Sequence, residues 1–413
     1  MSRIIIVGAG PAGMMAAIRA SQFTPEVVLI EKNSLPGNKL LLSGKGRCNI
    51  TNNCELEDFL KRFSANGQFL RDAFKKFFNR ELIEFFRERG LVLKIERQNR
   101  VFPETDRSAS IVEVLKKQLV KSRVMTAYNV TVNGLQVKAG KISGVRLESG
   151  EVVHVDKVVL ATGGVTYSFT GSTGDGLFWA QNSGHKITPI RPGLVALEIR
   201  KENFKLPEGL TLKNIRLRFS SGKKEIISEI GEMVFTDFGI SGPLVLTLSG
   251  QIADWILDKL KIRVEIDFKP ALSREQLENR LLREFNDLAR KNLDNVLKEL
   301  LPLSLVKIFL GRLKIPADKK ANQVTQQERK AIVDLLKGFN LEIKCTRPLE
   351  DAMITRGGVS LKDIDPRTME SRRVKGLYFC GEMIDVDADT GGFNLQAAFS
   401  TGYLAGESAA LSK

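Results

Sequence analysis

The residues with the clearest chemical meaning lie within the first 31 positions. Gly8, Gly10 and Gly13 have the spacing G-x-G-x-x-G, and Glu31 ends the next apolar segment. In this pattern the first glycine allows a tight turn, the second lets backbone approach a pyrophosphate, and the third lets a helix pack closely on a strand. The helix N-terminus binds the anion, and the terminal acid accepts hydrogen bonds from ribose hydroxyls. We predict a dinucleotide site, in which the carboxylate of Glu31 would disfavour the 2′-phosphate of NADP. The alternative is that these glycines only form an ordinary turn.

A second polar segment, residues 37–53, reads GNKLLLSGKGRCNITNN. It lacks the apolar periodicity of a core element, so we expect a loop that wraps a cofactor with backbone groups and short side chains. Cys48 is the candidate proton donor to substrate, and the equally good alternative is a small residue packed beneath the cofactor. Arg47 and Asp237 are further candidate catalytic residues, for phosphate contact and substrate orientation, as is Lys45. The predicted cofactor contacts here are Lys39, Ser43, Gly44, Gly46, Arg47, Asn49 and Thr51.

The elements that must position these residues begin with a βαβ unit. Residues 4–7 are predicted as a strand, 11–20 as a helix and 27–30 as a second strand. Residues 127–160 alternate like a β-meander, and residues 377–382 form a strand that leads into a second glycine-rich turn and helix. Between them, strand-like segments start near residue 190, and residues 273–337 are helical, with Ser273 and Gln276 as a capping box. The fold class is therefore α/β, with a discontinuous first domain.

Composition excludes several classes of protein. The 413 residues carry 63 Lys plus Arg against 48 Asp plus Glu, a net charge of +15, and are 43% hydrophobic, which is enough for two or three folded domains. The four Cys form no CxxC pair and there are two His, too few ligands for a zinc site or a His-dependent triad, so we expect no metal. The first apolar run is broken by glycines and a proline, and no run is long enough to span a membrane. We expect a cytoplasmic protein without membrane association.

Four motifs resemble those of the BaiN/RdsA family of bacterial flavoproteins. They are GNKLLLSGKGRCNITN at 37–52, FTDFGISGP at 235–243, GGVSLKDIDPRTMES at 357–371 and GEMIDVDADTGGFNLQ at 381–396. The resemblance implies FAD and a two-dinucleotide-binding-domain, Rossmann-like fold with an inserted β-barrel and a helical insert. It gives an FAD domain at 1–190 and 351–413, a barrel at 191–272 and about 320–350, and a helical insert at 273–337.

The same resemblance implies further FAD contacts. The segments VVLATGG and LYFCGE would complete the site, with Glu382 or Asp385 at the ribityl chain. The turn before the last helix would aim backbone amides at the flavin pyrimidine ring, unless it is a simple loop into a helix. Arg100 resembles a family motif and would approach the pocket. The implied contacts are Ala12, Lys32, Ala161, Thr162, Gly163, Gly381, Glu382, Asp385, Gly391, Gly392, Phe393 and Asn394.

Family members are described as aminoacetone oxidases, bile-acid-pathway flavoproteins, or enzymes that reduce a uridine of large-subunit ribosomal RNA to dihydrouridine. Asp237 departs from the FTHFG or FTHWG expected of many members, which weakens transfer of activity from them. Charge favours the ribosomal RNA, because basic residues cluster at 75–80, 87–100, 213–218 and 280–291, where 280, 283, 287, 290 and 291 would share a helix face. The target base should be unpaired or flipped.

The expected reaction is hydride transfer from flavin N5 to uracil C6, with Cys48 or water protonating C5. No second G-x-G-x-x-G domain is present for nicotinamide, so NADH or NADPH would bind transiently over the flavin. Two alternatives remain. One is an FAD-dependent oxidase or reductase of a small amine or hydroxy-ketone, and the other is a non-catalytic, RNA-binding redox flavoprotein.

Overall fold

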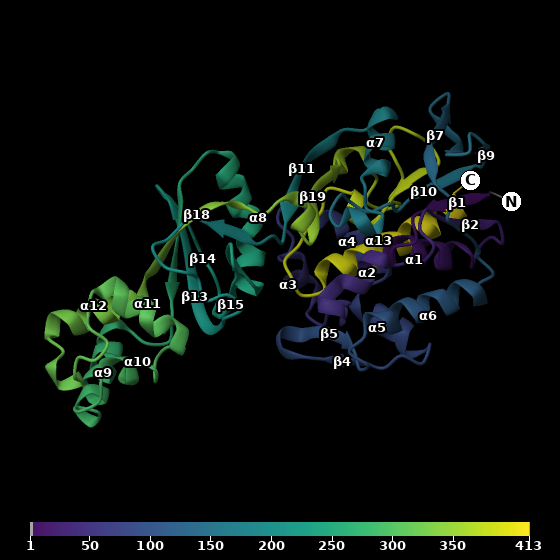
Figure 1. Ribbon diagram of the computed structural model, residues 1–413. Helices are drawn as coiled ribbons and strands as arrows, with labels where there is room; N and C mark the ends of the chain where they lie inside the picture. Colours follow the sequence, from purple (N-terminus) through teal and green to yellow (C-terminus); the bar gives the residue numbers. More distant parts are fainter. Residues whose placement is uncertain (1–2, 413) are drawn as a thin grey trace. The chain divides into compact units, whose positions relative to one another are not determined.

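The computed structural model describes residues 3–412, which divide into two compact units. The first unit combines the chain up to residue 193 with the chain from residue 348 onward, and the second comprises residues 194–347. Figure 1 shows both units coloured along the sequence. In this part of the chain no helix has the length and apolar character needed to cross a membrane.

A five-stranded parallel sheet forms the centre of the first unit. Its order is β20 (Leu377–Phe379), β10 (Lys157–Leu160), β1 (Ile4–Val7), β2 (Val27–Glu31) and β6 (Met125–Tyr128). The residues of β1 and β10 are all buried, as expected for parallel strands covered on both faces. The predicted βαβ unit is confirmed, with α1 (Pro11–Ala20) connecting β1 to β2.

Two helices from opposite ends of the sequence pack together on this sheet. Helix α13 (Phe393–Leu411) lies along α1, as the yellow and purple ribbons show (Figure 1). A Cβ placed at Gly402 or Gly406 would lie 2.2 Å from the carbonyl oxygen of Ala12 or Ala16, respectively. Only glycine permits this approach, so the spacing of the two glycines fixes the register of the two helices.

Smaller elements surround the sheet. The predicted meander is confirmed as β7 (Val132–Lys138), β8 (Lys141–Leu147) and β9 (Val152–His154). A second small sheet has the order β3, β5, β4, and β11 pairs with β19 in antiparallel fashion. The remaining elements of this unit are α2 (Asn38–Leu42), β3 (Thr51–Asn52), α3 (Leu56–Leu60), α4 (Arg71–Lys76), α5 (Asn79–Arg87), β4 (Leu93–Ile95), β5 (Arg100–Pro103), α6 (Ser108–Lys121), α7 (Asp175–Asn182), β11 (Ile187–Gly193) and β19 (Ile354–Val359).

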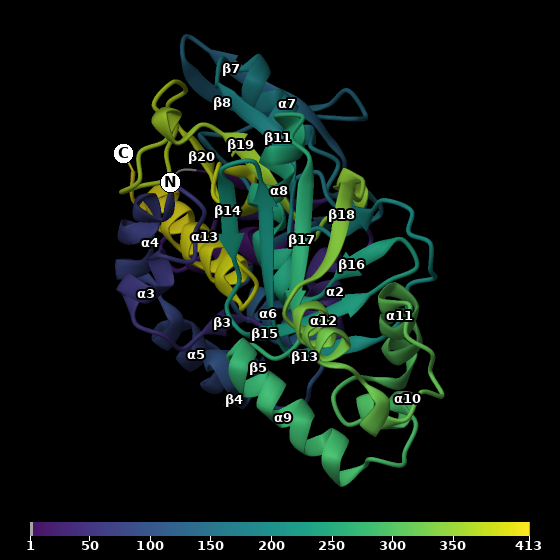
Figure 2. The ribbon, with the colours of Figure 1, turned by 90° about the vertical axis from the view of Figure 1, so that its left-hand side faces the viewer.

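The second unit contains a ring of six strands. β13 pairs in turn through β15, β16, β12 and β18 to β17, and β17 pairs back to β13, while β14 extends β13 at one side. Figure 2 shows these long strands with α8 beside them. The bounds are β12 (Leu197–Ile199), β13 (Thr211–Ser221), β14 (Lys224–Ile227), β15 (Gly231–Phe235), β16 (Gly239–Ser241), α8 (Pro243–Leu257), β17 (Ile262–Asp267) and β18 (Phe339–Thr346).

Four helices lie between β17 and β18, namely α9 (Arg274–Asp287), α10 (Leu293–Leu297), α11 (Leu303–Leu313) and α12 (Gln326–Lys337). The Ser273 hydroxyl accepts from the Gln276 N–H at 3.1 Å, which confirms the predicted capping box. Helix α9 ends at Asp287, so the expected basic helix face through Arg290 and Lys291 is wrong. Within 320–350, where barrel sequence was expected, the only strand is β18, because residues 326–337 are helical.

Candidate functional site

The glycine turn after β1 has the geometry that the sequence predicts. Gly8 has a φ of +101°, and a Cβ there would lie 2.6 Å from the Ala161 carbonyl oxygen. A Cβ at Gly13 would lie 1.8 Å from the carbonyl oxygen of Gly8, so α1 and β1 close-pack only with glycine there. A Cβ at Gly10 would meet no described atom within 4 Å. Gly10 therefore faces open space at the N-terminus of α1, where a pyrophosphate would bind.

Glu31 is the last residue of β2 and Lys32 follows it, and the two side chains bond different partners. The buried Glu31 carboxylate accepts from the Ala9 N–H at 2.7 Å and from the Asn33 N–H at 2.9 Å, which places it directly beside the glycine turn. Lys32 instead bonds Asp175 at 2.8 Å, at the start of α7. The role of Glu31 as a ribose acceptor stays a prediction, whereas the charge of Lys32 is matched by Asp175.

The loop after α2 makes a tight left-handed turn. Gly44, Lys45 and Gly46 have φ values of 57°, 57° and 84°, and Cys48 follows with 60°. The Cys48 N–H donates to the Ser43 carbonyl at 3.0 Å, and the Ser43 hydroxyl donates to the Leu40 carbonyl at 2.6 Å. The turn leaves Lys45 exposed and leads directly into β3, which carries Thr51.

Cys48 itself is completely buried in the core of the first unit. Burial raises the pKa of its thiol to about 12, against a small opposing effect of a hydrogen bond with Ser43. A thiol with no exposed surface holds its proton and reaches a substrate only if its neighbours move. This geometry favours the packed alternative over the role of proton donor.

Arg47 lies in a network of four charged groups. Its guanidinium bonds Glu96, and its Nε lies 2.8 Å from Asp106, while Lys94 contacts the same two carboxylates. These hydrogen bonds hold the pKa of Glu96 and Asp106 below their usual values. The guanidinium also lies 4.2 Å over the Phe102 ring. A phosphate contact by Arg47 would require this network to open.

The nearby Arg100 begins β5. Its Nε donates to the Arg97 carbonyl at 3.1 Å, and its guanidinium lies 6.0 Å from the Phe102 ring. Arg100 therefore borders the same aromatic ring as Arg47, on the small sheet that carries Thr51.

An ion pair joins the loop to the returning chain. Lys39 Nζ lies 2.6 Å from Glu382 Oε2, and both side chains are about one-fifth exposed. Glu382 also accepts from the Thr355 N–H at 2.7 Å, and Lys39 bonds the Thr166 hydroxyl. The lone pairs of Glu382 are thus occupied. No side-chain partner of Asp385 is found within residues 3–412, so Asp385 is the better of the two candidates for a ribityl contact.

The N-terminus of α13 meets the same loop. Gly392 caps the helix with a φ of +95°, and a Cβ there would lie 2.4 Å from the Thr51 carbonyl oxygen. The Asn394 side chain bonds the Ala388 backbone at 3.0 and 2.9 Å, and Phe393 packs 4.7 Å from the Phe59 ring. The side chains of Phe393 and Asn394 are therefore occupied internally. What the turn offers a ligand is the positive end of a 19-residue helix with no acid in its first turn.

Three buried polar atoms test whether a dinucleotide fits here. Asn49 Oδ1, Thr51 Oγ1 and Thr162 Oγ1 have no hydrogen-bond partner among the described residues. Buried polar atoms in folded proteins are nearly always paired, so such orphans point to a missing ligand or water. All three lie in segments predicted to contact FAD. Together with the open space at Gly10, they fit a ligand rich in hydrogen-bonding groups.

The other predicted contacts lie where their segments come together. Ala161 touches the glycine turn through its carbonyl, Thr162 and Gly163 follow it, and a Cβ at Gly381 would lie 2.9 Å from that of Ala12. Sequence reasoning missed Thr166 and Thr355, which position the Lys39–Glu382 pair. The sequence feature that accompanies them is Gly164, because a Cβ at this position would lie 2.1 Å from the Thr355 hydroxyl oxygen.

Asp237 lies in the second unit, in the turn between β15 and β16, where it is exposed. The turn is closed by the Thr236 N–H, which donates to the Gly239 carbonyl at 2.9 Å, and by the Gly239 N–H, which donates to the Thr236 hydroxyl. A role for Asp237 in substrate orientation stays a prediction. Residues 3–412 contain no group of three side chains arranged to hold a metal ion.

Comparison with known proteins identifies the family. The HI0933-like protein Rossmann domain matches residues 2–408. A 3-dehydro-bile acid delta(4,6)-reductase of Clostridium scindens is 32% identical over 99% of this chain and 99% of its own length. A ribosomal RNA dihydrouridine synthase of Escherichia coli is 29% identical over 97% and 96%, respectively. The structure of 3-ketosteroid delta1-dehydrogenase from Sterolibacterium denitrificans matches over the full length of both chains, with a TM-score of 0.54 and 13% identity. This match shows a similar fold.

Proposed function

Because the chain belongs to the HI0933-like family and is an FAD-dependent oxidoreductase, we propose that it reduces a uridine of large-subunit ribosomal RNA to dihydrouridine. The observation that carries this proposal is end-to-end similarity to a ribosomal RNA dihydrouridine synthase combined with a net charge of +15. A basic protein attracts the phosphate backbone, and this term supplies much of the affinity of proteins for nucleic acids.

In the proposed reaction the bound, reduced cofactor supplies a hydride to C6 of uracil, and a proton is added at C5. The N-terminus of α1 and the open face of Gly10 would hold the pyrophosphate, and Glu31 would accept from the ribose. Asp385 would hold the ribityl chain, and the backbone amides of residues 391–394 would stabilise negative charge on the pyrimidine ring. We propose NADH or NADPH as the transient reductant.

The remaining predicted contacts complete the proposed cradle. The Lys39–Glu382 ion pair keeps the loop 37–53 against the returning chain, and the unpaired oxygens of Asn49, Thr51 and Thr162 would accept hydrogen bonds from the cofactor. Cys48 fills space beneath the loop. Water is then the better source of the C5 proton than the buried thiol.

The distribution of charge refines the RNA argument. Several members of the predicted basic clusters form ion pairs, including Lys76 with Glu407, which also pairs with Arg19, and Arg218 with Glu225. Exposed ion pairs of this kind leave little net field for a polyanion. The proposal therefore depends on the cations that no described carboxylate pairs, such as Lys45 in the cofactor loop.

A second candidate is reduction of a small, conjugated ketone, favoured by the 32% identity with the bile acid reductase. The activities of these two relatives share their chemistry. A 4,6-diene beside a 3-ketone and the C5=C6 bond beside the C4 carbonyl of uracil are both carbon–carbon double bonds conjugated to a carbonyl. Both can accept hydride at a carbon remote from the carbonyl, so the same flavin chemistry would serve either substrate.

Nucleoside mass spectrometry of large-subunit ribosomal RNA tests the proposal. RNA from a strain lacking the gene should lose one dihydrouridine, and the wild-type gene should restore it. A Gly13→Ala gene, which cannot form the cofactor turn, is the control that should not restore it. An unchanged modification profile in the deletion strain refutes the RNA substrate. Binding of RNA without turnover under NADH or NADPH would favour the non-catalytic alternative, and turnover of an enone alone would favour the small molecule.

A further inference from the structure

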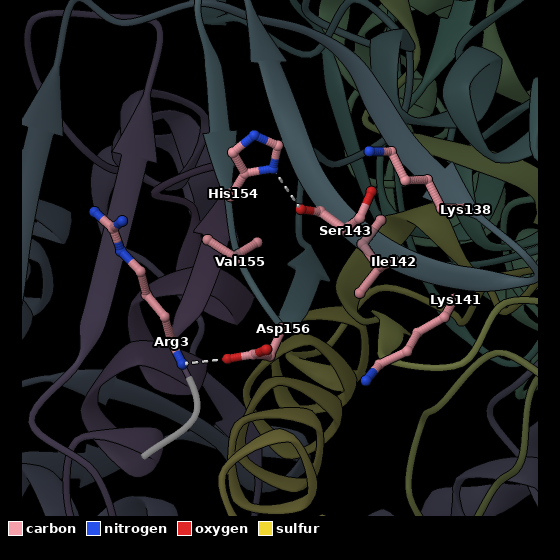
Figure 3. A pocket seen from close by; sticks show the side chains of 8 residues that line it. All are labelled: Arg3, Lys138, Lys141, Ile142, Ser143, His154, Val155 and Asp156. Atoms are coloured by element: carbon pink, nitrogen blue, oxygen red, sulfur yellow. Dashed lines mark hydrogen bonds between the residues drawn. The ribbon is translucent and has the colours of Figure 1, made fainter.

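A shallow hollow of about 400 Å³ lies in the first unit, at the edge of the parallel sheet opposite the cofactor turn. Arg3 precedes β1 and Asp156 precedes β10, so both lie at the amino ends of parallel strands, whereas Gly8 follows the carboxyl end of β1. Lys138 and Lys141, from the β7–β8 hairpin, lie on one side of the hollow and Arg3 on the other (Figure 3). We call it the amino-edge hollow.

The cations of the amino-edge hollow lack carboxylate partners. Lys138, Lys141 and the neighbouring Lys375 are exposed, and no described acid lies within ion-pair distance of them. The acid in the lining, Asp156, accepts from the Arg3 backbone N–H at 3.1 Å. The hollow therefore presents an excess of positive charge.

The backbone holds two of these lysines side by side. The Ile142 N–H donates to the Lys375 carbonyl at 2.9 Å, and the Lys375 N–H donates to the Gly140 carbonyl at 2.9 Å, which makes Lys141 and Lys375 partners in a β-bridge. Like charges placed opposite each other on a sheet destabilise it unless an anion joins them. Burial lowers the pKa of the adjacent buried Lys157, and Lys141 and Lys375 lower it further, against the opposing effects of Glu370 and Asp156.

We propose that the amino-edge hollow binds the phosphate backbone of the RNA substrate, an inference that rests on the proposed function. The hollow is open and its cations are spread over its rim, as suits a chain that passes across it rather than an enclosed small molecule. The four residues of β1 separate the two edges of the sheet by roughly 13 Å. The RNA held here is therefore not the nucleotide that is reduced; it anchors a remote part of the ribosomal RNA while the target reaches the cofactor edge.

The test compares two variants that lose the same charge. In the first, Lys138, Lys141 and Lys375 are changed to Gln; in the second, Lys116, Lys121 and Arg123, exposed cations on or just after α6, are changed to Gln. Binding of protein-free large-subunit ribosomal RNA from the deletion strain is measured between 50 and 200 mM salt, about the range over which phosphate contacts dominate. Three lost contacts should weaken binding about 10- to 100-fold and lower the salt slope by about 2 to 3. The α6 variant should change little.

Dihydrouridine formation on the same RNA is measured in parallel, with FAD content and reduction by NADH or NADPH as controls for folding. If both variants lose affinity equally, or if the first variant binds RNA as wild type, the hollow is not a docking site. Normal dihydrouridine formation in that case leaves the proposed function standing. If wild-type protein forms no dihydrouridine, the proposed function fails. In that case a selective loss of affinity in the first variant still supports an RNA-binding hollow, and no RNA affinity in any variant overturns both.

Discussion

Replacing Gly10 by alanine separates cofactor binding from folding. Gly10 has φ −76° and ψ −178°, a conformation that alanine adopts freely, and a Cβ there meets nothing within 4 Å in the protein. Alanine restricts the unfolded chain, so the apoprotein should gain about 0.4–1 kcal/mol of unfolding free energy. The added methyl group fills the space of the pyrophosphate, and FAD affinity should fall about 10- to 100-fold, that is, by about 1.4–2.7 kcal/mol.

Gly13→Ala is the matched control for this experiment. Its Cβ would lie 1.8 Å from the Gly8 carbonyl oxygen, so backbone must shift and the apoprotein should lose about 3 kcal/mol. Urea unfolding of the apoprotein measures stability, and titration of apoprotein with FAD, followed by flavin fluorescence, measures affinity. A Gly10→Ala protein that binds FAD as wild type would show that no pyrophosphate lies against this turn, and destabilised apoprotein would show that the open space is filled.

Three further outcomes are expected. Cys48→Ala should lose about 1 kcal/mol of stability. In a single turnover, substrate should oxidise the pre-reduced variant at the wild-type rate; a much slower oxidation would identify the thiol as the proton donor. Lys39→Met and Glu382→Gln should show a coupling energy of about 1 kcal/mol in a double-mutant cycle of unfolding, and additive effects would contradict the ion pair. Burial lowers the pKa of His185 in the folded protein. As the pH falls below the usual pKa of histidine, the unfolded chain therefore binds more protons than the folded chain, and the free energy of unfolding should fall between pH 7 and pH 5. His185→Gln should flatten that urea-unfolding profile, and an unchanged slope would refute the assignment.

The parts of the fold that the sequence predicted are those encoded locally. The glycine spacing, the two strands of the βαβ unit and the capping box at Ser273 each depend on residues close together in sequence. The end of α9 depends on distant chain instead: the Leu293 N–H donates to the Lys319 carbonyl at 2.8 Å, and Asn292 pairs with Lys320, which draws the backbone out of the helix. Periodicity alone continues through this point.

The candidate site shows the same division. The loop 37–53 was recognised from its composition, but the partners of its charged side chains are remote in sequence. Arg47 bonds Glu96 and Asp106, 49 and 59 residues away, and Lys39 bonds Glu382, 343 residues away. Such pairings arise from tertiary packing, as does the burial of Cys48. Sequence therefore predicted which segments come together better than it predicted what each side chain bonds.

The order of strands in the parallel sheet has a consequence for synthesis. β1 and β10 are made early, but their neighbour β20 and the covering helix α13 are made only after the whole second unit. At about 5–20 residues per second, roughly 13 to 50 seconds separate the synthesis of β10 from that of α13, which completes this part of the fold. The second unit, being continuous, can fold during that interval. Acquisition of the flavin then becomes a step that follows synthesis of α13, and the protease resistance of stalled chains that lack residues 377–411 would test this order.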